Sequence, residues 1–244
     1  MNDRAAESEG TEGEEETAKA AVPEPSEMPT TEMRIGKVTL APGIEILIRP
    51  IQPDDKRLLT SSFEKLSSQS KYQRFFSPVE RLSEKDLEYL TEVDHVNHEA
   101  LIAIDPDDGD LVGVARYVRI EPPNRAEIAV IVSDHWQGRG LGNVLLEGLV
   151  ARARAAGIDE FLAVVLRSNE EARTLFENLI PGGSHTNTGD PGQVEILIDI
   201  PERGRFRESR LSRIFSSTAR GNLSFMPLLW LRKRMNRHHE DQPE

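Results

Sequence analysis

The sequence predicts an α+β fold in which helices flank a mixed, mostly antiparallel central sheet. Short apolar stretches rich in β-branched residues recur along the chain, and longer stretches with helical spacing of apolar residues lie between them. Three of the strand-like stretches follow one another with only turn sequences between them, which is typical of antiparallel neighbours. The later strands are separated by helices, which allow parallel neighbours, so the sheet is expected to be mixed.

The two ends of the chain differ in composition from its middle. Residues 1–35 are an acidic segment whose first 32 residues hold ten acidic and two basic side chains and no Leu, Ile, Phe, Trp or Tyr, so we expect disorder there. Residues 201–244 are a basic tail with ten basic and five acidic side chains, which we expect to be partly helical. Residues 36–200 are therefore the predicted folded domain.

Composition also limits the classes of function. The chain has no cysteine, which excludes disulfides, thiolate catalysis and cysteine-ligated zinc. The middle of the chain is acidic, with a net charge of −9 over residues 33–200, which argues against nucleic acid as a partner and suits a cationic amine substrate. No apolar stretch reaches the roughly 18 residues that span a bilayer, so we expect a cytoplasmic protein. Residues 225–234 are apolar and then basic, which makes the tail a candidate for contact with a membrane surface or a protein partner.

The first expected elements precede the central strands. Residues 44–49 form a first strand that Pro50 ends, Pro53 starts a helix, and a second helical stretch covers residues 70–76. Ser83 and Asp86 have the spacing of a helix cap, so a third helix starts there. The apolar residues expected to face the core from the first and third helices are Leu58, Leu59, Phe63, Leu66, Leu87, Leu90 and Val93.

The rest of the domain alternates strands and helices. Three strands, joined by turns rich in Pro, Asp and Gly, are expected at residues 99–105, 111–120 and 128–132. A helix follows over about residues 140–156, with Gly157 as its C-cap. The remaining elements in order are a strand at 161–166, a helix capped by Ser168 or Asn169, a glycine-rich loop at 181–192 and a last strand at 194–200.

The chain is organised around residues 125–143, where a buried strand runs into a glycine-rich turn and a long helix. Gln137-Gly138-Arg139-Gly140-Leu141-Gly142 places glycines at alternating positions, and the N–H groups at such a turn and helix start can hold a phosphate. No Gly-Lys-Ser/Thr follows, which excludes a P-loop, and a dinucleotide-binding fingerprint would require glycine where Asn143 stands. A tight turn with only a structural role is the remaining alternative.

This turn and the order of elements resemble the GNAT superfamily of acyl-CoA-dependent N-acyltransferases over about residues 44–200. The family signature is Gln or Arg, two residues, Gly, one residue, and then Gly or Ala, which residues 137–142 match. In the first third, Ile48-Arg49-Pro50, Asp54-Asp55 and Tyr72-Gln73-Arg74-Phe75-Phe76 resemble the bacterial protein-lysine acetyltransferases. The resemblance implies a GNAT domain at residues 36–200, acetyl-CoA as co-substrate, and an amine acceptor for which a protein lysine is favoured.

The resemblance also implies a role for each part of this segment. The N–H groups of residues 138–143 would bind the pyrophosphate of coenzyme A. The strand before the turn would pair with the pantetheine arm and place one N–H group on the thioester oxygen, and Asn169 would contact the pantetheine as well as cap its helix. The cofactor-binding residues implied in this way are Val130, Ile131, Val132, Gln137, Gly138, Arg139, Gly140, Leu141, Gly142, Asn143 and Asn169.

Glu127 is the residue that we expect to act as general base. An acceptor lysine has a pKa near ~10.4, so its ammonium group must lose a proton before it attacks the thioester. The catalytic glutamate of the lysine acetyltransferases lies in an Ala-Glu-Ile/Val-Ala setting, which Ala126-Glu127-Ile128-Ala129 matches. The alternative is an exposed glutamate near a strand end with no part in catalysis.

The sequence departs from the family at one point. Many members carry a tyrosine that protonates the leaving thiolate, but this chain has Leu175-Phe176 there, so the thiolate would leave unassisted or be protonated by water. Two alternatives therefore stay open: acetylation of a small-molecule amine, and a non-catalytic acyl-CoA-binding module that senses the cofactor. His95 and His98, expected on one helix face, lack a third ligand, so no metal site is predicted.

Overall fold

One sheet of eight strands runs through the part of the chain that the structure describes. The structure is a computed structural model, and it describes residues 36–68, 80–166, 185–186 and 193–200. All neighbouring strands are antiparallel except β5 and β6, which are parallel. The order across the sheet is β1 (Gly36–Ala41), β2 (Ile44–Pro50), β3 (His98–Ile104), β4 (Leu111–Ile120), β5 (Arg125–Val132), β6 (Glu160–Leu166), β8 (Gln193–Asp199) and β7 (His185–Thr186). The expected α+β fold with a mixed, mostly antiparallel sheet is therefore confirmed.

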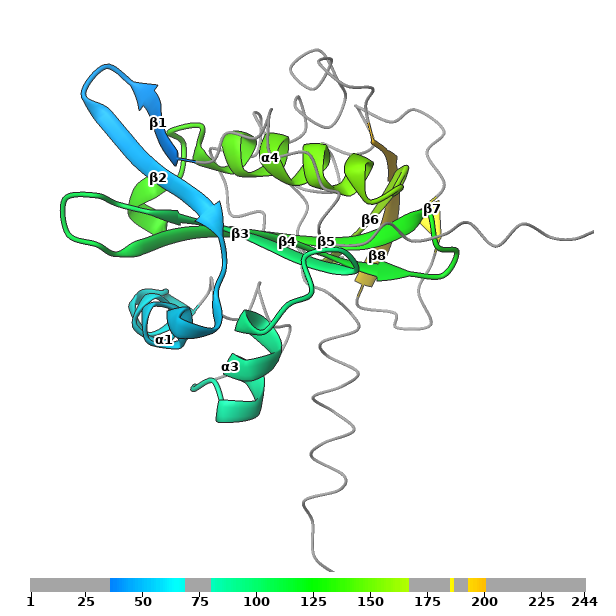
Figure 1. The fold of residues 1–244 in the computed structure, drawn as a ribbon, viewed down its shortest axis with the longest axis horizontal. Helices are drawn as coiled ribbons and strands as arrows, with labels where there is room; N and C mark the ends of the chain where they lie inside the picture. Colours follow the sequence, from blue (N-terminus) through cyan, green and yellow to red (C-terminus); the bar gives the residue numbers. More distant parts are fainter. Residues whose placement is uncertain (1–35, 69–79, 167–184, 187–192, 201–244) are drawn as a thin grey trace, which may run out of the picture.

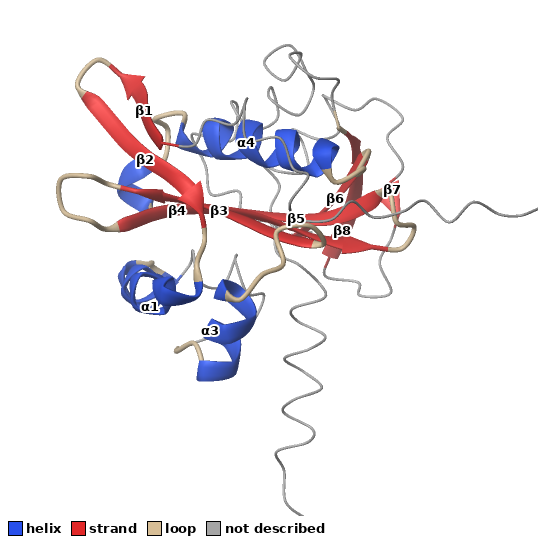
Figure 2. Cartoon of the chain, in the orientation of Figure 1, coloured by secondary structure: helices blue, strands red, loops and turns tan. Residues whose placement is uncertain are grey.

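Helices cover both faces of this sheet. The long helix α4 (Leu141–Ala155) lies on one face, and α1 (Lys56–Lys65) and α3 (Glu84–Thr91) lie on the other (Figures 1 and 2). Each face has its own apolar cluster: Leu145 and Leu149 of α4 pack in the first, and Phe63 of α1 and Leu90 of α3 pack in the second. Because side chains alternate along a strand, the strands from β2 to β5 contribute to both clusters.

The starts of α1 and α3 are fixed by local contacts. The turn η2 (Pro53–Asp55) leads into α1, and both carboxylate oxygens of Asp55 accept hydrogen bonds of 2.7 Å from the guanidinium group of Arg49 on β2. At α3, Ser83 and Asp86 form the expected capping box: the Ser83 hydroxyl oxygen accepts from the N–H of Asp86, and the Asp86 carboxylate accepts from the N–H of Ser83. Both helices therefore begin where the sequence predicts, apart from the single turn of η2.

Two strands were absent from the sequence-based expectation. β1 precedes the expected first strand and forms a hairpin with β2, and β7 lies in the segment expected to be only a loop. β1 is an edge strand with an alternation of half-buried and exposed residues, in which Val38 and Leu40 face the first cluster. Such a short edge strand has weak apolar periodicity, which explains why the sequence pattern did not reveal it.

The expectation that His95 and His98 share a helix face was wrong. α3 ends at Thr91, and His98 is the first residue of β3. The Asp94 carboxylate accepts hydrogen bonds from the N–H groups of Val96, Asn97 and His98, which fixes a turn there, and His95 takes a left-handed φ of 59° within that turn. A side chain that binds the backbone in this way competes with helix formation.

Several expectations concern residues outside the described ranges. These are the acidic segment 1–35, the helical stretch at 70–76, the helix that contains Asn169 and the basic tail 201–244. Among the helices that are described, none is long and apolar enough to cross a membrane.

Candidate active site

The parallel strands β5 and β6 pair over only part of their length. Their register pairs are Arg125 with Glu160, Ala126 with Phe161, and Glu127 with Leu162. β5 continues to Val132 and stays paired with β4 throughout, and β6 continues to Leu166 and stays paired with β8. Beyond Glu127 the two strands are therefore no longer sheet neighbours, and we call the region between their unpaired stretches the slot.

The hydrogen-bonding pattern shows which backbone groups face the slot. Residues of an antiparallel strand direct their N–H and C=O groups alternately to one side and the other. The N–H of Ser133 donates to the C=O of Val112 on the β4 side, at 2.9 Å. Because the direction alternates, the backbone groups of Ile131, two residues before Ser133, also face β4. The backbone groups of Val130 and Val132 face the slot. The slot is thus lined by backbone donors and acceptors from every second residue.

The glycine-rich turn lies directly beyond the slot. A short turn of helix, η3 (Asp134–Trp136), follows β5, and α4 begins at Leu141. Gly138 and Gly140 have φ values of 74° and 83°, in the left-handed region that glycine adopts without strain. A Cβ atom built on Gly140 would have no neighbouring atom within 4 Å, so space is left at this position for another molecule to approach.

The start of α4 provides donors at the same place. The first N–H groups of a helix have no acceptor within the helix, and here the first turn consists of Leu141, Gly142 and Asn143. The helix dipole adds positive potential, so this end of α4 suits an anion such as a pyrophosphate. The side chain of Leu141 is buried in the first apolar cluster, so only its backbone is available for binding.

Two side chains of the turn have contacts within the protein. The Nε2 group of Gln137 donates to the C=O of Val132 at 3.1 Å and to the Asp134 carboxylate at 3.3 Å, which ties the turn to the end of β5. The guanidinium carbon of Arg139 lies 5.1 Å from the centre of the Trp136 ring, so a cation–π contact holds this charge beside the glycines. Gln137 therefore shapes the turn, while Arg139 adds positive charge to it.

Glu127 lies where the slot begins. It is the last residue of β5 that pairs with β6, and only 2% of its surface is exposed. Its neighbour Ile128 packs in the first cluster, against α4, so alternation places the Glu127 side chain on the α1 and α3 face. The alternative of an exposed glutamate at a strand end is therefore wrong. A carboxylate at this position can reach a group that enters the slot from that face.

Arg116 of β4 is a second buried charge on the same face, and the sequence did not single it out. Its Nη1 donates to Nε2 of His98 at 2.9 Å and its Nη2 donates to the C=O of Leu90 at 2.9 Å. Burial lowers the pKa of Arg116 to about 10, with Tyr89 and Glu99 acting in the opposite direction. The one signal in the sequence is a charged residue in the middle of a mainly apolar strand, which also carries Arg119 near its end.

Comparison with known proteins agrees with this geometry. The model of the Acetyltransferase (GNAT) family matches residues 63–179. An acetyltransferase of Pseudomonas aeruginosa is 30% identical over 139 residues, which are 56% of this chain and 75% of that protein. The chain belongs to the GNAT family. The glycine-rich turn beyond the slot is the segment, residues 137–142, that matches the family signature.

Two further relatives carry the name Pat. Acetyltransferase Pat of Mycolicibacterium smegmatis is 33% identical over 166 residues, which cover 67% of this chain and 48% of that protein. The crystal structure of the GNAT domain of S. lividans PAT is 36% identical, with a TM-score of 0.59, and it covers 67% of this chain and 95% of that domain. This chain thus spans about half the length of the Mycolicibacterium relative but nearly all of the isolated GNAT domain.

The structure brings most of the sequence-predicted site residues together. Glu127, the slot-facing Val130 and Val132, and the turn 137–143 follow one another along one edge of β5 and into α4. Ile131 lies in the same strand, but its backbone faces β4 and its side chain packs in the second cluster. Asn169 lies outside the described residues.

Proposed function

We propose that this protein transfers the acetyl group of acetyl-CoA to an amine, with Glu127 as the general base. The observation that carries the proposal is the separation of β5 from β6 immediately after Glu127. It creates a slot with backbone hydrogen-bonding groups along one side, a buried carboxylate at one end and an anion-binding turn at the other. An extended acyl-pantetheine chain that ends in a pyrophosphate has the matching sequence of groups.

The chemistry assigns a task to each end of the slot. Glu127 would take a proton from the acceptor ammonium group, and the neutral amine nitrogen would then attack the thioester carbon. The negative charge that develops on the carbonyl oxygen needs a fixed donor, for which the slot-facing N–H of Val130 or Val132 is suited. A C–N bond forms, the C–S bond breaks and the thiolate of coenzyme A leaves. Water can carry the second proton of the amine nitrogen, which is lost as the amide forms, to this thiolate, because a thiol has a pKa near ~8.5.

The acceptor that we propose is a lysine side chain of a protein. The resemblance of residues 48–50 and 126–129 to the lysine acetyltransferases supports it, as does the identity of 36% to the GNAT domain of S. lividans PAT. The acidic net charge of −9 over residues 33–200 favours a cationic acceptor over an anionic one. A small-molecule amine is the nearest alternative within the same chemistry.

A binding assay and a turnover assay together test the proposal. Isothermal titration calorimetry with acetyl-CoA measures binding, and a thiol-release assay with a lysine-containing protein extract as acceptor measures transfer. Binding without thiol release on any amine would contradict the enzyme and support a sensor of acyl-CoA. Acetyl-lysine proteomics of cells with wild-type protein and with Glu127→Gln would then identify the acceptor. Equal acetylation in both, when thiol release by the purified variant is lost, would contradict a protein acceptor.

A further inference from the structure

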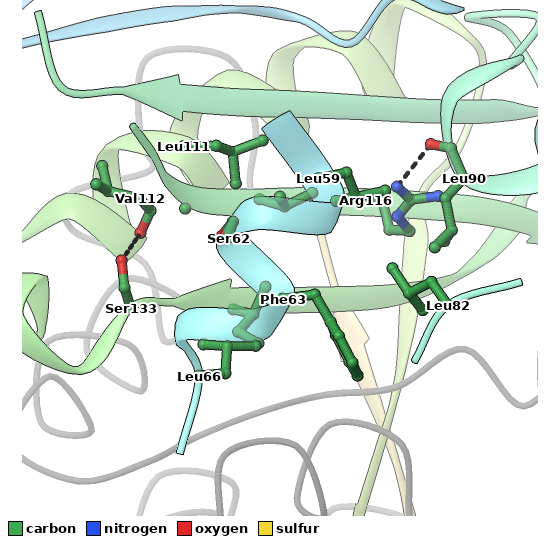
Figure 3. A pocket seen from close by; sticks show the side chains of 13 residues that line it. Leu59, Ser62, Phe63, Leu66, Leu82, Leu90, Leu111, Val112, Arg116 and Ser133 are labelled. Carbon is green, nitrogen blue, oxygen red and sulfur yellow. Dashed lines mark hydrogen bonds between the residues drawn. The ribbon is translucent and has the colours of Figure 1, made fainter. Parts of the chain in front are cut away.

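A small cavity lies under α1, on the same face of the sheet as Glu127. Its volume is about 40 Å³, which is room for about three water molecules. Leu59 and Phe63 of α1 cover it, and Val114 of β4 and Ile131 of β5 form part of its floor. We call it the α1 cavity. Figure 3 shows Leu59 and Phe63 of α1 beside the cavity, with Arg116 at one end and Ser133 at the other.

Among the described residues, Arg116 is the one cationic side chain in the lining of the α1 cavity, and the Glu99 carboxylate, which forms its own ion pair with Arg152, acts on its charge without a hydrogen bond to it. The residue is 1% exposed, and its two terminal nitrogens donate to His98 and to the C=O of Leu90, which are not carboxylates. Within the described ranges the Nε–H group of Arg116 has no hydrogen-bond acceptor, and the guanidinium group has no ion-pair partner. A buried cation in this state is costly, so an anion is expected to accompany it when the site is occupied.

The register of β4 and β5 places Arg116 close to the slot. Arg116 is directly opposite Ala129, and Val114 is directly opposite Ile131. Ala129 and Ile131 follow Glu127 on the same face of β5, and Ala129 has the smallest side chain of the three. Of the three side chains of β5 on this face, the one directly opposite Arg116 is therefore the methyl group of Ala129.

We propose that the α1 cavity binds the far end of a dicarboxylic acyl group, such as succinyl or glutaryl, with its carboxylate accepting a hydrogen bond from the Nε–H of Arg116. The apolar lining suits the methylene groups of such a chain, and the guanidinium group supplies the charge that the carboxylate needs. A plain alkyl chain would fill the same space but would bring no carboxylate to Arg116.

This inference rests on the proposed function, because it states which acyl groups the same transfer reaction would prefer. After the acceptor ammonium has lost one proton to Glu127, the amine nitrogen forms a bond to the thioester carbon, the C–S bond breaks and the thiolate of coenzyme A leaves. The second proton that the nitrogen loses passes through water to this thiolate. The second carboxylate of the acyl group takes no part in these steps. The product would be an amide that carries a negative charge in place of the positive charge of the amine.

Calorimetry with matched acyl-CoA esters tests the inference without knowledge of the acceptor. Butyryl-CoA and succinyl-CoA have acyl chains of equal carbon number, and they differ by the terminal carboxylate. We expect the wild-type protein to bind succinyl-CoA or glutaryl-CoA at least about tenfold more tightly than butyryl-CoA, as for a desolvated charge pair. In Arg116→Met this ratio should fall to about one, because the charge is absent and the side-chain length is kept.

Two more variants separate charge, volume and fold. Ser62→Leu adds bulk on α1 inside the cavity. It should therefore weaken the binding of butyryl-CoA and succinyl-CoA relative to that of acetyl-CoA, and this effect does not depend on the charge of Arg116. Lys37→Met removes one exposed positive charge on β1, far from the α1 cavity, and should keep the wild-type ratio. If Arg116→Met does not fold, the wild-type ratio and Ser62→Leu still decide the matter.

The outcomes distinguish this inference from the proposed function. Tighter binding of butyryl-CoA than of both dicarboxylic esters by the wild-type protein, or an unchanged ratio in Arg116→Met, would overturn the inference alone. Failure of every ester, acetyl-CoA included, to bind would overturn the proposed function with it.

Discussion

Two buried arginines lie on opposite faces of one sheet, and they differ in the groups that surround them. Arg152 of α4 forms an ion pair with Glu99 of β3, whose carboxylate is fully buried and also accepts from Nδ1 of His95 and the N–H of Ala100. Arg116, on the other face, has only neutral acceptors among the described residues. The paired charge is typical of a structural contact, whereas the charge of Arg116, which has no ion-pair partner among the described residues, lies beside a cavity and on the same face as a buried glutamate. Arg152 on the α4 face is therefore expected to affect stability, and Glu127 and Arg116 on the α1 and α3 face are expected to affect chemistry.

The largest expected effect is on that second face. Glu127→Gln keeps the shape of the side chain but removes the base, so thiol release should fall by about 10² to 10⁴-fold at neutral pH. Binding of acetyl-CoA, measured by calorimetry, should stay within a few-fold of wild type because the phosphate-binding turn is unchanged. An unchanged rate at every pH would show that Glu127 is not the base.

On the α4 face, loss of one partner of the buried pair should reduce stability. Arg152→Met leaves the Glu99 carboxylate buried without its cation, so the free energy of unfolding should fall by about 3–5 kcal/mol in urea denaturation. The double variant Glu99→Gln with Arg152→Met should recover part of this loss, because no uncompensated charge remains. Equal stability of the single and double variants would contradict the pairing.

The phosphate-binding turn should respond to a change of backbone freedom. Gly140→Ala places a Cβ atom on a residue with φ of 83°, which costs about 1–2 kcal/mol and shifts the N–H groups of the turn. We expect acetyl-CoA to bind about tenfold more weakly, as measured by calorimetry, because the donors lose their arrangement.

Gly43→Ala is the matched control for this variant. Gly43, in the hairpin between β1 and β2, has a φ of 80°, and a Cβ atom added there would, as at Gly140, meet no other atom within 4 Å. The substitution should cost similar stability without a change in acetyl-CoA affinity. If Gly43→Ala and Gly140→Ala lost the same acetyl-CoA affinity, the cause would be general destabilisation and not a change in the phosphate-binding turn.

The smallest expected effect concerns the ion pair at the start of α1. Burial acts to raise the pKa of Asp55, but hydrogen bonds from Arg49 and from the N–H of Gln52 outweigh it and lower this pKa. A lowered folded-state pKa adds stability above the unfolded value near ~3.9, and that stability is lost as the pH falls through the folded-state pKa. Asp55→Asn should therefore lower the Tm at pH 6 and lessen the decrease in Tm between pH 5 and pH 3. An identical pH profile in both proteins would contradict this linkage.

Local signals in the sequence account for the parts of the fold that were predicted correctly. The Ser83 and Asp86 cap, the strand at residues 111–120 and the strand, glycine turn and helix of residues 125–155 each depend on neighbours within a few positions. The point at which β5 leaves β6, by contrast, depends on strands that are distant in the sequence. The same holds for Arg116, whose significance lies in the cavity and in the absence of a carboxylate among its described contacts. No pattern within one strand contains that information.

The three register pairs between β5 and β6 have a consequence for amide hydrogen exchange. Along residues 128–132 the N–H groups that face β4 are bonded within the sheet, whereas those of Val130 and Val132 face the slot. In the proposed complex, a pantetheine chain would act as an added strand and protect the slot-facing groups. Ligand binding should therefore slow exchange at every second residue of β5, and leave the residues between them as slow as before.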